Sequence, residues 1–131
     1  MGGFSDYWEN KILDHIFGKS SYTPPTIYVG LSTADPTDDG SGLAEPSGNA
    51  YTRAQTSACD WNTASNGSLN NAGDITFAQA TGNWGTITHF VMFDAATAGN
   101  MLAHGVLSQS KSISESDTAR FEAGDLDISL D

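Results

Sequence analysis

Basic side chains and cysteine are scarce in this chain of 131 residues, and no long hydrophobic run occurs in it. There are 5 Lys and Arg residues against 16 Asp and Glu residues, which gives a formal net charge of −11. A surface this acidic repels the phosphates of nucleic acids and of anionic membranes, so we expect neither as a partner. The N-terminal segment has no basic leader before an apolar run and therefore predicts neither a secretion signal nor a membrane span.

Catalytic motifs are also missing from the chain. Cys59 is the sole cysteine, so an internal disulfide is impossible. It lies beside Asp60, whose carboxylate disfavours the thiolate that a nucleophile needs, and we interpret it as a structural thiol. No Gly-x-Ser-x-Gly elbow is present, and the many Ser and Asp residues make any assembled triad unspecific. We therefore expect a protein that is not an enzyme and has no cofactor.

Short strands separated by turn residues dominate the rest of the pattern. Apolar and small or polar residues alternate over 26–31, and the most hydrophobic segment, 86–93, is typical of a central strand. The segment 101–107 follows it after a turn and predicts a hairpin. Weaker strands are expected at 51–57, 74–78, 111–115 and 125–130, with an Asn66-Gly67 turn in the polar stretch between the first two. We predict a mainly β fold, an antiparallel β-sandwich or jelly roll of about seven or eight strands with one N-terminal α-helix.

The helix is expected over residues 6–17, with Ser5 as its N-cap and Gly18 as its end. Trp8, Ile12 and Ile16 recur at helical spacing and form an apolar stripe, which Leu13 and Phe17 widen. A helix this short needs a packing partner. We expect residues 1–18 to be a unit that either joins the core or docks on another subunit, and residues 19–131 to form a single β-sandwich domain.

A long acidic loop is expected at residues 32–50. Asp35, Asp38 and Asp39 are close enough in sequence to suggest a weak Ca²⁺ site, although the EF-hand spacing is not met. Solvated acids in turns are the simpler interpretation. Contact of Asp38 and Asp39 with a basic partner is a further alternative.

Histidines and tryptophans provide the remaining candidates. His89 and His104 fall on neighbouring predicted strands and could bind a metal with Asp94, but nothing in their spacing demands it. Trp84, in the sequence GNWG, either anchors its loop on the core or is exposed at an interface. Trp61 is another aromatic that could stack on a sugar.

Three segments resemble a family of small bacteriophage and prophage virion proteins, often labelled tail-fibre or head-decoration proteins. They are ENKILDHIFGKSSYTPPTIYVGLSTADPTDDGSGLAEPSGNAYTR, ITFAQATGNWGTITHFVMFDAATAGNMLAHGVL and DTARFEAGDLDISLD. Together they span nearly the whole chain. The resemblance implies a non-enzymatic part of a phage particle that is assembled in the host cytoplasm.

Two functions are compatible with this resemblance. The first is a protein of the particle exterior, either a capsid cement or decoration subunit or the base of a head fibre. It would form a homo-oligomer, a trimer by expectation, and contact a major capsid or tail protein through Trp8, Ile12, Ile16, Asp38, Asp39 and Trp84. The second is a tail-fibre or receptor-binding module that recognises host glycan through Tyr51, Trp61 and Trp84.

Overall fold

The computed structural model describes residues 2–130, and over this range the chain forms nine β-strands, one α-helix and one short 3₁₀ turn. The fold class is the predicted one, mainly β with a single N-terminal helix. The elements in chain order are β1 (Gly2–Phe4), α1 (Asp6–Ile16), β2 (Tyr28–Ser32), β3 (Ala54–Gln55), the 3₁₀ turn (Ala58–Asp60), β4 (Ser68–Asn70), β5 (Ile75–Thr76), β6 (Gly85–Phe93), β7 (Met101–Ile113), β8 (Arg120–Phe121) and β9 (Asp127–Ser129).

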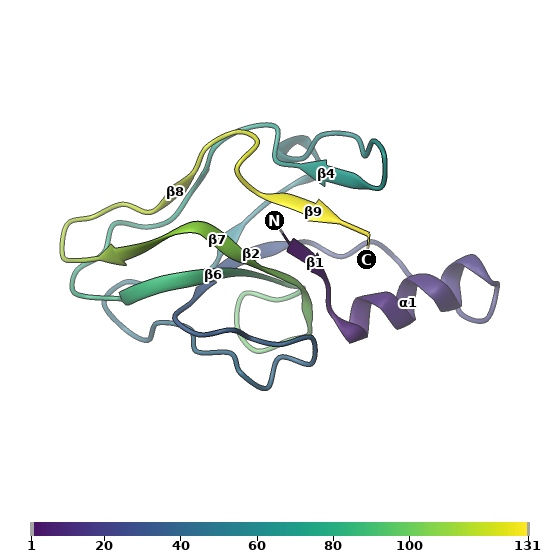
Figure 1. The fold of residues 1–131 in the computed structure, drawn as a ribbon, viewed down its shortest axis with the longest axis horizontal. Helices are drawn as coiled ribbons and strands as arrows, with labels where there is room; N and C mark the ends of the chain where they lie inside the picture. Colours follow the sequence, from purple (N-terminus) through teal and green to yellow (C-terminus); the bar gives the residue numbers. More distant parts are fainter. Residues whose placement is uncertain (1, 131) are drawn as a thin grey trace.

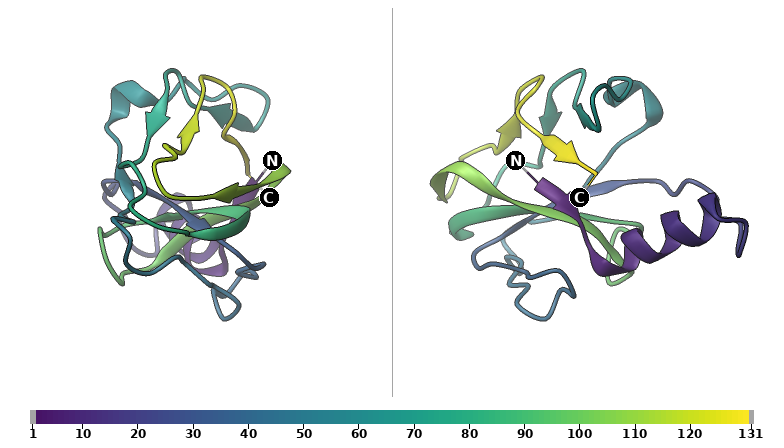
Figure 2. Two further views of the ribbon diagram at one scale, coloured as in Figure 1. Left: turned by 90° about the vertical axis from the view of Figure 1, so that its left-hand side faces the viewer. Right: turned by 45° about the vertical axis from the view of Figure 1, so that its right-hand side comes forward.

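Seven of these strands form one curled sheet in the order β3-β2-β6-β7-β1-β9-β4, and β5 pairs with β8 in a separate two-stranded sheet (Figure 1). The β1–β9 pairing is parallel, whereas the other pairings are antiparallel. Figure 2 shows β8 and β9 arching over the face of the β6–β7 ribbon. The second layer of the predicted sandwich is therefore built by the curl of the large sheet and by the small sheet.

The β6–β7 hairpin is confirmed at the centre of the large sheet. β7 is longer than expected, since Gly85 pairs with Ile113 and the predicted strand at 111–115 is its continuation. The turn at Asn66 and Gly67 is also confirmed. Both residues have positive φ values, 54° and 76°, which a two-residue hairpin turn requires.

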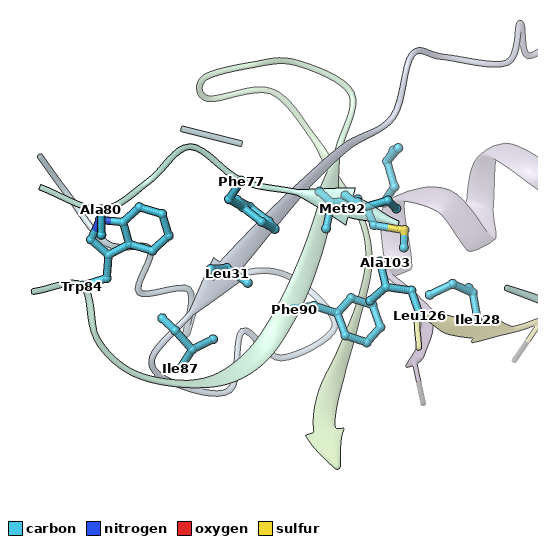
Figure 3. Packing of buried hydrophobic residues seen from close by; sticks show 13 residues of the cluster. Leu31, Phe77, Ala80, Trp84, Ile87, Phe90, Met92, Ala103, Leu126 and Ile128 are labelled. Carbon is cyan, nitrogen blue, oxygen red and sulfur yellow. The ribbon is translucent and has the colours of Figure 1, made fainter. Parts of the chain in front are cut away.

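Side chains from both layers make one main core (Figure 3). β6 contributes Ile87, Phe90 and Met92 to it. Its alternate residues Val91 and Phe93 are buried on the opposite face, in a second cluster with Met101. Apolar residues on both faces of a strand exclude it from an edge, so β6 can only occupy a covered, central position. The main core consists of Val29, Leu31, Ile75, Phe77, Ala80, Trp84, Ile87, Phe90, Met92, Leu102, Ala103, Leu126 and Ile128.

β1 was not predicted, because two glycines and one phenylalanine carry no strand pattern. It lies between β7 and β9, where Gly2 pairs with Gly105 on one side and Ile128 on the other. A Cβ atom at Gly2 would lie 2.5 Å from the Phe90 ring and 2.7 Å from the His104 carbonyl oxygen. Only glycine permits this close approach, so the start of the chain is an integral part of the sheet.

α1 follows directly and is capped as predicted. The Ser5 hydroxyl accepts a hydrogen bond from the Trp8 backbone N–H at 3.3 Å and donates one to the Met101 carbonyl. The Trp8 ring packs on Phe4, with ring centroids 4.6 Å apart. Beyond this base the helix projects from one end of the sheet (Figures 1 and 2), and none of its residues is buried.

Replacing Gly2 with alanine tests the central position of β1. We expect Gly2→Ala to lower the free energy of unfolding by about 1–3 kcal/mol, because the added methyl group overpacks a closed site. Urea denaturation measures the change. Gly73→Ala is the matched control, since an added Cβ there meets nothing within 4 Å. Equal stabilities for the two variants would contradict a structural role for β1.

Candidate interaction surfaces

The outer half of α1 carries three exposed apolar side chains. Leu13, Ile16 and Phe17 are 54%, 67% and 73% exposed. Residues three and four apart lie on the same side of a helix, so these three form one patch, which we call the helix tip. Of the predicted stripe, Trp8 and Ile12 are partly buried, and Trp8 packs against the core. The stripe is thus divided into an anchored base and an exposed tip, where Leu13 and Phe17 matter more than the sequence pattern suggested.

The acidic loop at residues 33–50 covers the second face of β6, where Leu43 packs on Val91, Phe93 and Met101. Its acids do not point at one common centre. The Asp35 carboxylate accepts from the Thr37 N–H at 2.9 Å, and the Asp39 carboxylate accepts from the Ser41 N–H at 2.9 Å. These bonds are the turn contacts expected of the simpler interpretation.

Asp38, the third acid of the proposed Ca²⁺ site, lies 2.8 Å from His104 Nε2. This contact fixes the loop to β7. His89, the second histidine, has its Nδ1 atom 2.8 Å from the Thr88 hydroxyl. Asp94 accepts instead from the N–H and side-chain amide of Asn100, at 2.8 and 3.0 Å. Within residues 2–130, no three His, Cys, Asp or Glu side chains meet in a group that could hold a metal ion.

A charged network that the sequence analysis missed joins the loop to the sheet. The Arg53 guanidinium donates to both carboxylate oxygens of Glu45, at 2.7 and 3.0 Å, and to the carbonyl oxygens of Ala95 and Ala98, both at 2.8 Å. Its side chain is only 5% exposed and stacks over the Phe93 ring, 3.7 Å from the ring centroid. A desolvated ion pair in which four of the five guanidinium N–H donors are used in this way fixes one loop geometry.

Tyr51 completes this network. Its hydroxyl donates to Glu45 at 2.6 Å and accepts from the Leu31 N–H at 2.9 Å. Burial, and then the hydrogen bond to Glu45, raise the pKa of the Tyr51 hydroxyl far above its ordinary value. Gly30 lies beneath the pair, where a Cβ would be 2.9 Å from both Glu45 and Tyr51 oxygens. The Tyr51 hydroxyl therefore supports the loop.

Trp84, for which the sequence left anchoring of its loop and exposure at an interface as alternatives, is buried within the chain. It is 4% exposed, stands edge-on to Tyr51, and donates its indole N–H to the Asn49 carbonyl at 2.9 Å. It anchors its loop on the core, the alternative left open by the sequence. Of the aromatics considered for sugar stacking, Tyr51 and Trp61 are partly exposed, and each lines a surface cleft.

Trp61 lines an apolar cleft of about 360 Å³ on the side of the molecule where α1 begins. We call it the tryptophan cleft. The Trp61 indole N–H donates to the Thr56 hydroxyl at 3.0 Å, so the ring is held in place as part of the cleft wall. No charged side chain is among its lining residues, of which the main apolar ones are Trp8, Ile27, Trp61, Leu69, Met92 and Ile128.

Comparison with protein-family models matches residues 3–129 to the family Gp80, described as "Podophage GP4 fiber I protein gp80". The chain belongs to this family. Its match covers nearly the whole fold, from β1 to β9, and confirms the resemblance to phage virion proteins. The chain is thus a phage structural protein and a component of the virion. No protein with curated annotation matches the sequence.

The segments on which the resemblance is based have clear structural roles in this fold. The EPSG and YTR sequences supply Glu45, Tyr51 and Arg53 of the charged network, and the GNWG sequence supplies the buried Trp84. These motifs therefore encode the attachment of loops to the sheet. Over residues 2–130, no helix has the length and apolar character needed to cross a bilayer.

Removing the charge of Glu45 tests the network. We expect Glu45→Gln to lower the free energy of unfolding by about 3 kcal/mol, because Arg53 would keep its charge without a counter-ion in a desolvated site. Asp74→Asn is the matched control: Asp74 lies 3.9 Å from Arg120, and both side chains are half-exposed. A pair of this kind contributes about 0–1 kcal/mol. Chemical denaturation of both variants measures the difference, and equal losses would argue against a special role for Arg53.

The loop also carries a pH-dependent contact. Hydrogen bonds from the Ser41 N–H and then from the Thr37 hydroxyl lower the pKa of Asp39 from 3.8 to about 2. Because the folded state favours the carboxylate, this stabilisation is complete above the ordinary pKa and is lost as the pH falls through 2. We expect Thr37→Val to raise the pKa of Asp39, as measured by NMR titration of the carboxyl carbons. An unchanged titration midpoint would contradict the Thr37 contact.

Proposed function

We propose that this protein is a non-enzymatic fibre subunit on the exterior of the phage particle, attached to neighbouring virion subunits through the helix tip. The observation that carries the proposal is the exposure of Leu13, Ile16 and Phe17 at the end of a helix whose base is anchored in the sheet. Exposed single apolar residues are ordinary, but three adjacent ones on a projecting element are typical of a contact surface.

Rigid attachment of the helix base favours this function. Phe4 and Trp8 pack together, and the Asp6 N–H donates to the Asp38 carbonyl at 3.0 Å. The helix is therefore held at its start by the sheet and the acidic loop together. A partner that binds the tip gains a fixed direction relative to the sheet, and little ordering is required on binding.

The family description favours a fibre over the capsid cement or decoration role that the sequence analysis put first. The proposal includes a homo-oligomer, with a trimer as the expected form, because closed symmetric homo-oligomers are the commonest assemblies of identical subunits. Recognition of host glycan has less support, because Tyr51 and Trp84 are committed to internal contacts. Copy number separates the two locations, since decoration requires hundreds of copies in each particle and a fibre only a few.

Substitution at the tip tests the attachment. We expect Phe17→Ser to reduce incorporation into virions about tenfold or more while leaving the thermal midpoint unchanged, because the lost ring is buried only on assembly. Quantitative gel densitometry of purified particles measures incorporation and gives the copy number of the wild type. Val106→Ser is the matched control, since Val106 is 56% exposed on β7. Normal incorporation of Phe17→Ser would overturn the proposal, and hundreds of copies in each particle would favour decoration.

A further inference from the structure

We propose that the helix tip of one copy inserts into the tryptophan cleft of a second copy. This deepens the proposed function, on which it rests, by naming the partner of the tip. The chain carries both halves of such a contact: an apolar projection formed by Leu13, Ile16 and Phe17, and an apolar cleft walled by Trp8 and Trp61.

The dimensions of the two halves agree. An apolar cavity of about 150 Å³ is large enough for a benzene molecule. The tryptophan cleft measures about 360 Å³, so it has room for the phenyl ring of Phe17 and part of a second side chain such as Ile16. The cleft lining is mostly apolar and includes the uncharged polar residues Asn62 and Thr63. A ring entering the cleft would therefore leave no buried charge unpaired.

The tip cannot reach the cleft of its own chain. Trp8 is both a wall of the cleft and a residue of the first turn of α1. Phe17 lies nine residues further on, which is about 14 Å along the helix axis and away from the body. Figures 1 and 2 show α1 leading away from the sheet. Since the cleft and the tip are fixed to one rigid helix, only another copy can bring them together.

Charge favours the same pairing. No Asp or Glu occurs between Asp14 and Asp35, and Lys19 lies just beyond the tip. The segment 6–19 holds two of the five basic residues but only three of the 16 acids, so most of the net charge of −11 lies on the remainder of the molecule. The tip is thus a weakly charged end with a lysine beside it. Electrostatic repulsion between the tip of one copy and the acidic remainder of another is therefore weaker than repulsion between the acidic remainders of two copies.

The contact joins two different surfaces, so each copy offers one tip and one cleft. Contacts of this kind close into rings or continue as chains. Three apolar side chains make a small interface compared with stable complexes, so the purified protein should associate weakly and reversibly. Neighbouring copies held in a virion would be bound more firmly, because their local concentration is high.

Disulfide cross-linking of purified protein tests the contact. Cys59 is exposed, lies in the 3₁₀ turn beside Ala58 of the cleft, and is the native thiol of the chain. Ser20→Cys adds a thiol of nearly equal size beside the tip, at another exposed position. On mild oxidation of this variant we expect a ladder of dimers and longer chains, with peptide mapping showing a link between position 20 and Cys59.

The controls use the same chemistry. Ser110→Cys places a thiol at an exposed position on β7, away from the cleft, and should cross-link to Cys59 about tenfold more slowly. Adding Phe17→Ser to the Ser20→Cys variant should slow the cross-link about tenfold, whereas adding Val106→Ser should not. The tenfold slowing by Phe17→Ser corresponds to loss of one buried apolar side chain.

Three outcomes would overturn the inference. The first is equal cross-linking of Ser20→Cys and Ser110→Cys. The second is cross-linking of Ser20→Cys that persists when Cys59→Ser is added, because the link would then join two helix tips. The third is a cross-linking rate that Phe17→Ser does not change. The incorporation experiment with virions tests the proposed function separately from the cross-linking experiment. If Phe17→Ser blocks incorporation but purified copies do not cross-link, the tip binds another virion protein and the proposed function stands. If the cross-link forms but incorporation is normal, the tip and the cleft meet in the purified protein without serving attachment in the virion, and the proposed function is wrong.

Discussion

Burial of β6 on both faces is the constraint on which the rest of the fold depends. One face contacts the curled remainder of the sheet and the small β5–β8 sheet, while the other, with Val91 and Phe93, needs a separate cover. The acidic loop supplies that cover through Leu43, and a loop can do so only if its backbone is held in one conformation. The ion pair between Glu45 and Arg53, with Tyr51, provides this restraint. A buried network in this protein thus serves packing.

The elements that could be predicted from the sequence are those with a local signal. The hairpin of β6 and β7, the capped helix after Ser5 and the turn at Asn66-Gly67 each follow from periodicity or from turn chemistry within a few residues. β1 could not be predicted, because its pairing with β7 and β9 joins opposite ends of the chain and because glycine at position 2 is required by the distant Phe90 ring. The role of Arg53 was hidden for the same reason: its partners come from residues 45, 93, 95 and 98.

The candidate site shows the same limit. Helical spacing identified the apolar stripe, but it could not tell which part of the stripe meets the protein's own core. That division depends on where Phe4 and the sheet lie relative to Trp8. For Trp84, the sequence left both burial and exposure open, and contact with Tyr51 and Phe77 buries it within the chain. Apolar residues found by pattern become interface candidates only after the core has been assigned.

The acidic composition has a local structural explanation. Many carboxylates accept hydrogen bonds from backbone N–H groups in turns, as short polar side chains commonly do. Examples are Asp35 with Thr37, Asp39 with Ser41, Asp60 with Ser57, Asp94 with Asn100, Asp117 with Ser114 and Asp125 with Glu122. These acids stabilise the turns of a protein with long loops. Because they have this structural role, the net charge does not by itself identify a basic partner.

With those acids and the aromatic residues Tyr51 and Trp84 engaged internally, the uncommitted apolar surfaces become informative. Val106 and Leu130 are exposed singly, as is common on protein surfaces. The helix tip and the tryptophan cleft differ from them, because each is a group of apolar side chains held by a rigid support. These two surfaces are therefore the ones that we propose for assembly. One surface projects and the other is hollow, so the tip of one copy can bind in the cleft of a neighbouring copy.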